Sequence, residues 1–312
     1  MTAGFSQQQR THRLHQAFGL MLALASAFRF APVCAAPVTS TAPILVSACP
    51  SIGTESAIVG RVNERLDISL KDGRSLHLAG LDPPQPTPDA PDFPARARDA
   101  LAAQFAGGKI TYLPLAPTPD RWGRIPAFVF FPRDQAGTRP TSVALFLLAR
   151  GFARFMPVPE AHPCQTAFLA AEAQARTAKL SLWRDPYYAI LAATNRAAFA
   201  ERAATNVIVE GRLASVTSNR YRMTLDFAPH RDGTFAVTIL QRNVAIFDRS
   251  GLDFRALIGR TLRIRGLLDL RFGPHIEIAN ADDVALITDK QKQGSMAKQS
   301  KTIAAPPPTQ HP

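Results

Sequence analysis

The sequence predicts a mainly β protein with helices, of the α+β class, whose second part is a small β-barrel. Residues 57–81 alternate apolar and polar side chains around Asp72-Gly73, which is typical of a β-hairpin. Residues 95–105 and 167–182 carry apolar side chains at helical spacing. From residue 207 onward, about five strand-like runs follow one another within roughly 80 residues. The 312 residues suit two compact domains with tails.

The first part continues with a proline-rich loop, two strands and two helices. Six prolines lie between residues 83 and 94, so this segment is expected to be a loop. Strands are predicted at 110–115 and 127–131, and a short helix at 143–150 that ends at Gly151. The Ala-rich helix over 167–182 runs into Trp183.

The second part is read as a small all-β domain. Strands are predicted at 207–216, 221–227, 234–240, 261–269 and 275–278, with a helix-like segment at 254–258 and a last apolar stretch at 284–287. In residues 259–266, Leu262 and Ile264 are expected to face inward, while Arg263 and Arg265 face outward. This rhythm is typical of an OB-fold strand. An outward arginine stripe suits a polyanion, and a solvated strand face is the alternative.

The N-terminus has the pattern of a secretion signal. Arg10 and Arg13 precede an apolar run over 17–28, and small residues follow around Ala35. We expect a signal peptide at 1–35, an irregular segment at 36–56, domains at 57–188 and 207–288 joined by a connector at 189–206, and a disordered tail at 289–312. The protein would be exported, to the periplasm or outside the cell, with no transmembrane span after cleavage. An uncleaved leader that anchors the chain to the membrane is the alternative.

The cysteines agree with export. Cys34 would leave with the leader, so Cys49 and Cys164 remain as an even pair. We predict a disulfide between them, and two buried free thiols are the alternative. His162 and Cys164 flank Pro163 like half of a metal site, but no other His/Cys cluster completes it.

The net charge of +12 and the pI of about 10.3 favour polyanionic partners such as nucleic acid. Part of this charge lies in the leader and the tail, so it is weak support.

Four segments of the first part occur in a characteristic order. They are Gly60–Leu70, Leu76–Gln85, Asp120–Ala127 and Ser142–Arg154, followed by the helix that closes at Leu182-Trp183. Together, over residues 57–188, they resemble the thermonuclease (staphylococcal nuclease-like, SNase) family. The resemblance implies a five-stranded OB-fold barrel with helices, and Ca²⁺-dependent cleavage of DNA and RNA by a nuclease, that is, a hydrolase.

The resemblance also assigns roles to single positions. Asp82 matches the family's calcium-binding aspartate, and Arg124 matches an arginine that clamps the phosphate. Three other positions depart from the family. Leu66 stands at a calcium carboxylate, Gln85 at the general base and His77 at the first phosphate arginine. Glutamine cannot take up a proton, and neutral histidine lacks the guanidinium fork.

Neighbouring residues are candidate substitutes. Glu64 could reach the site from a loop, and His77 could serve as a base. Asp67 lies one residue past Leu66, so in a strand it would face away and would need a bulge to reach the site. The surviving pair also has a structural explanation, in which Asp82 caps a turn and Arg124 packs on Trp122 or pairs with Asp120.

Three functions remain open from the sequence. The first is an exported thermonuclease-like protein, a pseudoenzyme with activity lost or strongly reduced, that binds nucleic acid or another polyanion. The second is an active Ca²⁺-dependent phosphodiesterase with a rearranged site, and calcium is its cofactor. The third is a structural or protein-interaction module of the cell envelope.

Overall fold

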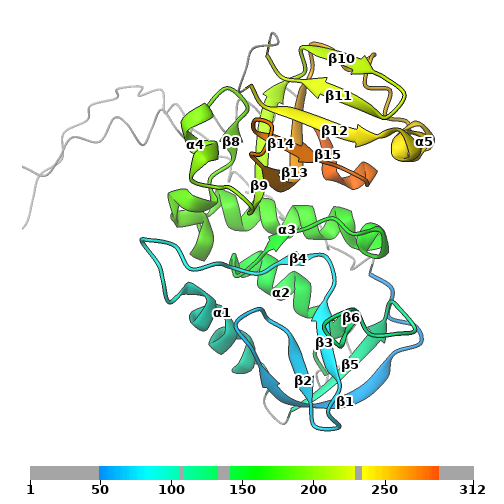
Figure 1. The fold of residues 1–312 in the computed structure, drawn as a ribbon. Helices are drawn as coiled ribbons and strands as arrows, with labels where there is room; N and C mark the ends of the chain where they lie inside the picture. Colours follow the sequence, from blue (N-terminus) through cyan, green and yellow to red (C-terminus); the bar gives the residue numbers. More distant parts are fainter. Residues whose placement is uncertain (1–48, 106–107, 133–140, 229–233, 288–312) are drawn as a thin grey trace, which may run out of the picture. The chain divides into compact units, whose positions relative to one another are not determined.

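Five strands of the first part close into a barrel. The computed structural model describes residues 49–105, 108–132, 141–228 and 234–287. The barrel order is β1 (Glu55–Val62), β2 (Ile68–Leu70), β3 (Ser75–Leu78), β6 (Arg124–Phe130) and β5 (Lys109–Pro114), which returns to β1. Figure 1 shows these strands together with α1 and α2 in the same part of the chain. The predicted five-stranded barrel with helices is therefore confirmed.

The predicted hairpin joins β2 to β3. The backbone N–H of Arg74 donates to the side chain of Asp72, and Gly73 has a φ of 90°, which few other residues adopt at low cost. The turn sets the antiparallel register, in which Ile68 pairs with Leu76. Both side chains are fully buried in the barrel core.

Three helices accompany the barrel: α1 (Phe93–Ala102), α2 (Val143–Arg150) and α3 (Gln165–Thr177). Ser142 caps α2 by accepting from the backbone of Leu145, and Gly151 ends it in a left-handed conformation. A Cβ at Gly151 would lie 2.5 Å from the carbonyl oxygen of Leu180, so glycine is also needed for close packing. The remaining short elements are β4 (Leu81–Asp82), β7 (Arg154–Phe155), η1 (Pro159–Cys164), η2 (Ser181–Arg184) and η3 (Pro186–Tyr188).

The second part is an eight-stranded sheet. Its order is β10 (Ser215–Ser218), β11 (Arg222–Asp226), β12 (Ala236–Leu240), β14 (His275–Glu277), β13 (Thr261–Asp269), β9 (Asn206–Arg212) and β8 (Leu191–Ala192), with β15 (Val284–Ile287) also paired to β13. Among the described strands the order is open, where the sequence predicted a closed barrel. β13 changes partners along its length, because residues 261–267 pair with β9 and Leu268 and Asp269 pair with β14.

The helices of the second part are α4 (Arg196–Ala200), α5 (Gln241–Arg249) and the short η4 (Ala281–Asp283). The segment 254–258, predicted to be helix-like, forms turns that include one helical hydrogen bond, from the backbone N–H of Leu257 to the carbonyl of Asp253. The side chain of Asp253 accepts from the backbone N–H groups of Arg255 and Ala256, which favours a turn.

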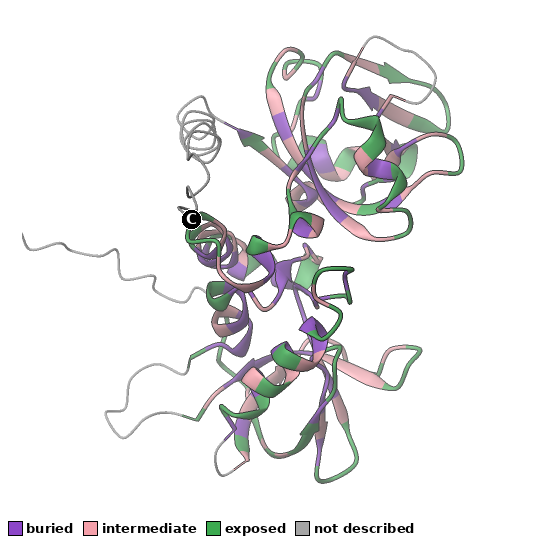
Figure 2. Cartoon of the chain, turned by 90° about the vertical axis from the view of Figure 1, so that its left-hand side faces the viewer, coloured by how far each residue is buried: buried purple, intermediate pink, exposed green. Residues whose placement is uncertain are grey.

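Each part has its own hydrophobic core, and a third cluster joins them within one compact unit that holds all the described residues. Figure 2 shows buried residues along the strands and helices of both parts. The third cluster contains Phe93, Ala175, Leu182, Trp183, Tyr188 and Ile208. Because Ile208 belongs to β9, the sheet packs directly on the helical side of the first part.

The expected outward arginine stripe of β13 is not a solvent-facing surface. Arg265 is buried and pairs with Glu172 of α3, and Arg263 pairs with Glu210 of β9. Both side chains do point away from the second core, as the alternation requires. That face is covered, so the arginines are neutralised inside the protein and are not displayed to a polyanion.

The predicted disulfide is confirmed. Cys49 and Cys164 are bonded across 115 positions of sequence, and both residues are buried. A disulfide is typical of an oxidising compartment. The predicted signal peptide and tail lie outside the described residues. In the described ranges, every helix is too short or too polar to cross a bilayer.

Candidate functional site

A tight turn places the first acidic side chain of the candidate site. The Asn63 side chain accepts from the backbone N–H groups of Arg65 and Asp67, at 2.9 Å each. Leu66 adopts a left-handed φ of 61° and turns its side chain into the barrel core. The strand alternation that would turn Asp67 away does not apply, because β2 begins only at Ile68. The expectation that Asp67 needs a bulge to reach the site was therefore wrong.

Asp67 lies between a histidine and an arginine. Its Oδ1 is 2.8 Å from Nδ1 of His77, and Arg124 Nη1 is 3.3 Å from both of its carboxylate oxygens. Burial raises the pKa of Asp67, but hydrogen bonds from His77 and Asn63 and the charge of Arg124 outweigh it, so the pKa lies below its ordinary value. Asp67 is therefore ionised at neutral pH.

The guanidinium of Arg124 is already engaged. Its Nε and Nη2 donate to Asp120 at 3.0 and 2.9 Å, and the group lies 4.8 Å from the centre of the Trp122 ring. This is the structural alternative stated from the sequence. Burial lowers the pKa of Arg124, but the two carboxylates outweigh it and raise it, so the side chain stays charged.

The balance of charge around Arg124 does not favour a bound phosphate. One guanidinium faces two carboxylates, Asp67 and Asp120, so the cluster has a net charge of about −1 when His77 is neutral. A phosphate clamp needs forks that are free to donate to the anion. In this protein the Arg124 guanidinium already donates to the carboxylates of Asp67 and Asp120.

Asp82 is held in a different cluster. Arg154 donates to its Oδ2 from Nη2 at 2.6 Å and from Nε at 3.0 Å, and Asn206 donates to its Oδ1 at 2.8 Å. Asp82 and Arg154 are both buried, and they lie on the paired strands β4 and β7. Asn206 begins β9, so this carboxylate joins the first part to the sheet.

The other family positions do not rebuild the site. Gln85 is exposed, and its backbone N–H and C=O bond with the hydroxyl of Tyr188. Glu64 is exposed and pairs with Arg98 of α1 at 3.1 Å. Leu66, as shown above, is part of the core.

The donor set does not fit a calcium ion. Ca²⁺ takes six to eight oxygen ligands, usually with several carboxylates. In the described ranges, no group of three or more His, Cys, Asp or Glu side chains could hold a metal. Asp82 is already paired with Arg154, and Asp67 already accepts from Arg124, His77 and Asn63.

The sequence did not indicate which residues hydrogen-bond to the carboxylates of Asp67 and Asp82. Asn206 lies outside the four characteristic segments, and Asn63 lies in the first of them at a position to which the resemblance gives no role. Arg154 does have a local signal, because it is a single charged residue in the apolar run Gly151–Met156. A buried arginine needs an acidic partner, and its antiparallel neighbour Asp82 supplies it.

A family model described as staphylococcal nuclease homologue matches residues 75–185. This segment is a staphylococcal nuclease-like domain. The match includes His77, Asp82, Gln85 and Arg124, and it begins after the turn that carries Asp67. No curated protein matches the chain.

Proposed function

We propose that the SNase-like domain does not cut nucleic acid by the calcium mechanism, and that the protein is an exported binding protein for nucleic acid or another polyanion. The buried ion pair between Asp82 and Arg154 is the observation that supports the absence of the calcium mechanism. Removing Asp82 from that pair to bind a metal would leave the Arg154 charge buried and unpaired, which is costly.

An exposed aromatic residue supports the binding half. Trp122 is 59% exposed, and the guanidinium of Arg121 lies 3.9 Å from its ring centre. Aromatic rings beside cationic groups are the usual platform for single-stranded nucleic acid, because every base has a face that can stack. The net charge of +12 favours the same class of partner.

Plasmid cleavage tests the loss of the calcium mechanism. We expect the same low cleavage in Ca²⁺ and in EDTA, with no further loss in Asp82→Ala, provided that circular dichroism shows this variant to be folded. Robust Ca²⁺-dependent cleavage that disappears in folded Asp82→Ala would contradict the proposal.

Fluorescence anisotropy with labelled single-stranded DNA tests the binding half. We expect Trp122→Ala to weaken binding by about 1–3 kcal/mol, roughly 5- to 150-fold, and affinity to fall steeply as salt rises. Tyr221→Ala is the matched control, since Tyr221 is also exposed and stacked on an arginine, but in the second part. Equal binding by wild type and Trp122→Ala would remove this surface from the proposal.

One observation favours a second function, a metal-independent hydrolase. An ionised carboxylate only accepts hydrogen bonds, so Asp67 orients His77 with its proton on Nδ1. His77 is 30% exposed in its side chain, so Nε2 is available as a base. If this function exists, EDTA-resistant cleavage of a phosphodiester will fall 10²–10⁴-fold in His77→Gln. EDTA-resistant activity that is unchanged in His77→Gln argues against it.

A further inference from the structure

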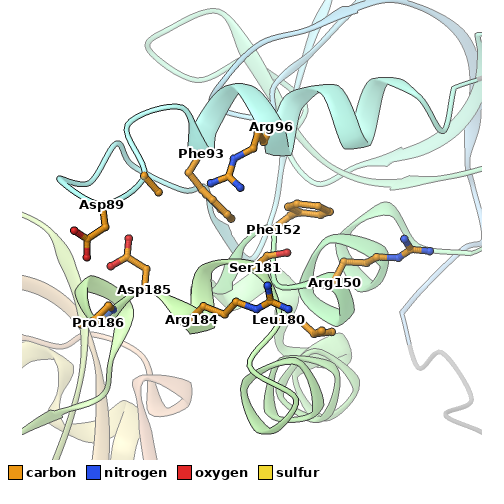
Figure 3. Close-up of a pocket in the computed structure, with 11 residues that line it drawn as sticks. Asp89, Phe93, Arg96, Arg150, Phe152, Leu180, Ser181, Arg184, Asp185 and Pro186 are labelled. Carbon is orange, nitrogen blue, oxygen red and sulfur yellow. The ribbon is translucent and has the colours of Figure 1, made fainter. Parts of the chain in front are cut away.

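A cavity of about 550 Å³ lies beside α1, the end of α2 and η2, away from the His77 cluster. No residue of the His77 or Asp82 clusters lines it. Figure 3 shows its labelled side chains: Arg96 and Arg184 reach over the cavity, and Arg150 extends outward from the end of α2, on the side away from Asp89. The lining residues that matter are Asp89, Arg96, Arg150, Phe152, Leu180 and Arg184.

The basic region of this cavity contains guanidinium N–H groups that can still donate to a ligand. Arg150 ends α2, and its guanidinium lies 5.1 Å from the Phe146 ring centre. Arg184 donates from Nε to the carbonyl of Lys179, which leaves its two terminal nitrogens. Within the described part of the chain, neither arginine has a carboxylate at ion-pair distance. By contrast, Arg124 in the barrel site has two.

Arg96 adds a third, partly neutralised charge. It pairs with Asp92 at 3.1 Å and lies over the ring of Phe93 at 4.9 Å. The pair is more than half exposed, so it is weak, and the Arg96 fork can turn toward an anion at little cost.

The opposite region is acidic. Figure 3 shows Asp89 and Asp185 side by side, on the side away from Arg150. Asp185 is already engaged, since it accepts from Thr87 and from the backbone of Tyr187. Asp89 is exposed and belongs to the proline-rich loop, so its carboxylate is the one that can accept from a ligand.

Apolar surface lies between the two charged regions. Phe152 and Leu180 are only partly buried, although both line the cavity. The volume is in the range of small-molecule sites, which combine apolar walls with a few polar groups that fix orientation.

We propose that this cavity binds a small elongated molecule with an oxyanion at one end, a flat apolar body, and a hydrogen-bond donor at the other end. The oxyanion, a phosphate or a carboxylate, accepts from Arg184 and from Arg150, whose exposed side chain turns from the Phe146 ring toward the ligand. The body lies against Phe152, and the donor reaches Asp89. Guanidinium forks match both kinds of oxyanion, so the structure assigns their shared chemistry.

Titration calorimetry with the full chain and a graded set of probes tests the assignment. The phosphate series is inorganic phosphate, phenyl phosphate and 4-aminophenyl phosphate, and the carboxylate series is acetate, phenylacetate and 4-aminophenylacetate. We expect affinity to rise at each step within a series, and the tighter series identifies the oxyanion. The proposal would be overturned if affinity did not rise along either series, or if neither 4-amino compound bound at millimolar concentration.

Single variants separate the three contacts. Arg150→Gln and Arg184→Gln should each weaken all members of the bound series by about tenfold or more. Phe152→Leu should remove mainly the gain from the phenyl group, and Asp89→Asn mainly the gain from the amine. Arg242→Gln, an exposed arginine of α5, is the control and should bind like wild type. If Arg242→Gln weakens binding as much as Arg150→Gln, the probes bind by general charge and the pocket is not their site.

Discussion

Asp82 and Arg124 are both held by partners inside this protein. The resemblance to the SNase family matches them to a calcium ligand and a phosphate clamp, roles that need a side chain free to meet a ligand. Arg154 and Asn206 hold the first, and Asp120 and Asp67 hold the second. A charged side chain is free to act on a ligand only when its neighbours leave it unpaired.

The Asp82 pair gives a prediction at the residue scale. Asp82→Asn should lower the free energy of unfolding by about 3–5 kcal/mol, because the Arg154 charge stays buried without its counter-ion. Urea denaturation measures this loss.

Asp92→Asn is the matched control, since it breaks an exposed ion pair with Arg96 and should cost no more than about 1 kcal/mol. Equal losses in the free energy of unfolding for the two variants would show that the buried pair stabilises the fold no more than the exposed pair.

The identities of the site residues could be predicted from the sequence, but their contacts could not. Asp82 and Arg124 stand out because short motifs surround them. The partners of Asp82 lie 72 and 124 positions away, at distances where no local pattern operates. The position of Asp67 depends on the left-handed backbone of Leu66, which an apolar side chain does not indicate.

At the scale of elements, local signals predicted some segments well. α2 and β13 have the predicted bounds, because a serine cap, a terminal glycine and strict alternation mark them. α5 was missed, since its sequence has no cap and only one fully buried side chain. The face of β13 was predicted correctly, but the helix α3 that covers it could not be, because that contact joins residues 93 positions apart.

The disulfide gives a prediction at this scale. It ties the segment before β1 to the start of α3. Replacing both cysteines by serine should lower the free energy of unfolding by up to about 4–5 kcal/mol, mainly because the unfolded chain gains freedom. Urea denaturation without reductant measures the change.

Wild type with reductant is the companion sample, and it should unfold near the midpoint of the double variant. A wild type that is insensitive to reductant, with a double variant of equal stability, would contradict this prediction.

At the scale of the whole molecule, a second buried ion pair joins the two parts. Burial raises the pKa of Glu172, but Arg265, which pairs with it, outweighs burial and holds the pKa below 4.5. The stabilisation is therefore present above pH 4.5, the ordinary value, and is lost as pH falls below it.

Glu172→Gln tests this pair. The variant should be less stable than wild type at pH 7, and the difference should shrink as the pH falls below about 4.5. Thermal unfolding at pH 3, 4, 5 and 7 measures it. A difference that stays constant with pH would show that Glu172 acts through packing and not through its charge.

The tie between Asp82 and Asn206 also has a consequence for evolutionary history. Suppose that a lineage changed Leu66, His77 and Gln85 to the carboxylate, the arginine and the general base that the resemblance implies at these positions. Asp82 would still be held by Arg154 and Asn206, and a new carboxylate at Leu66 would be buried in the barrel core. Changes at these three positions alone would therefore leave Asp82 engaged by the contacts that attach the sheet to the first part.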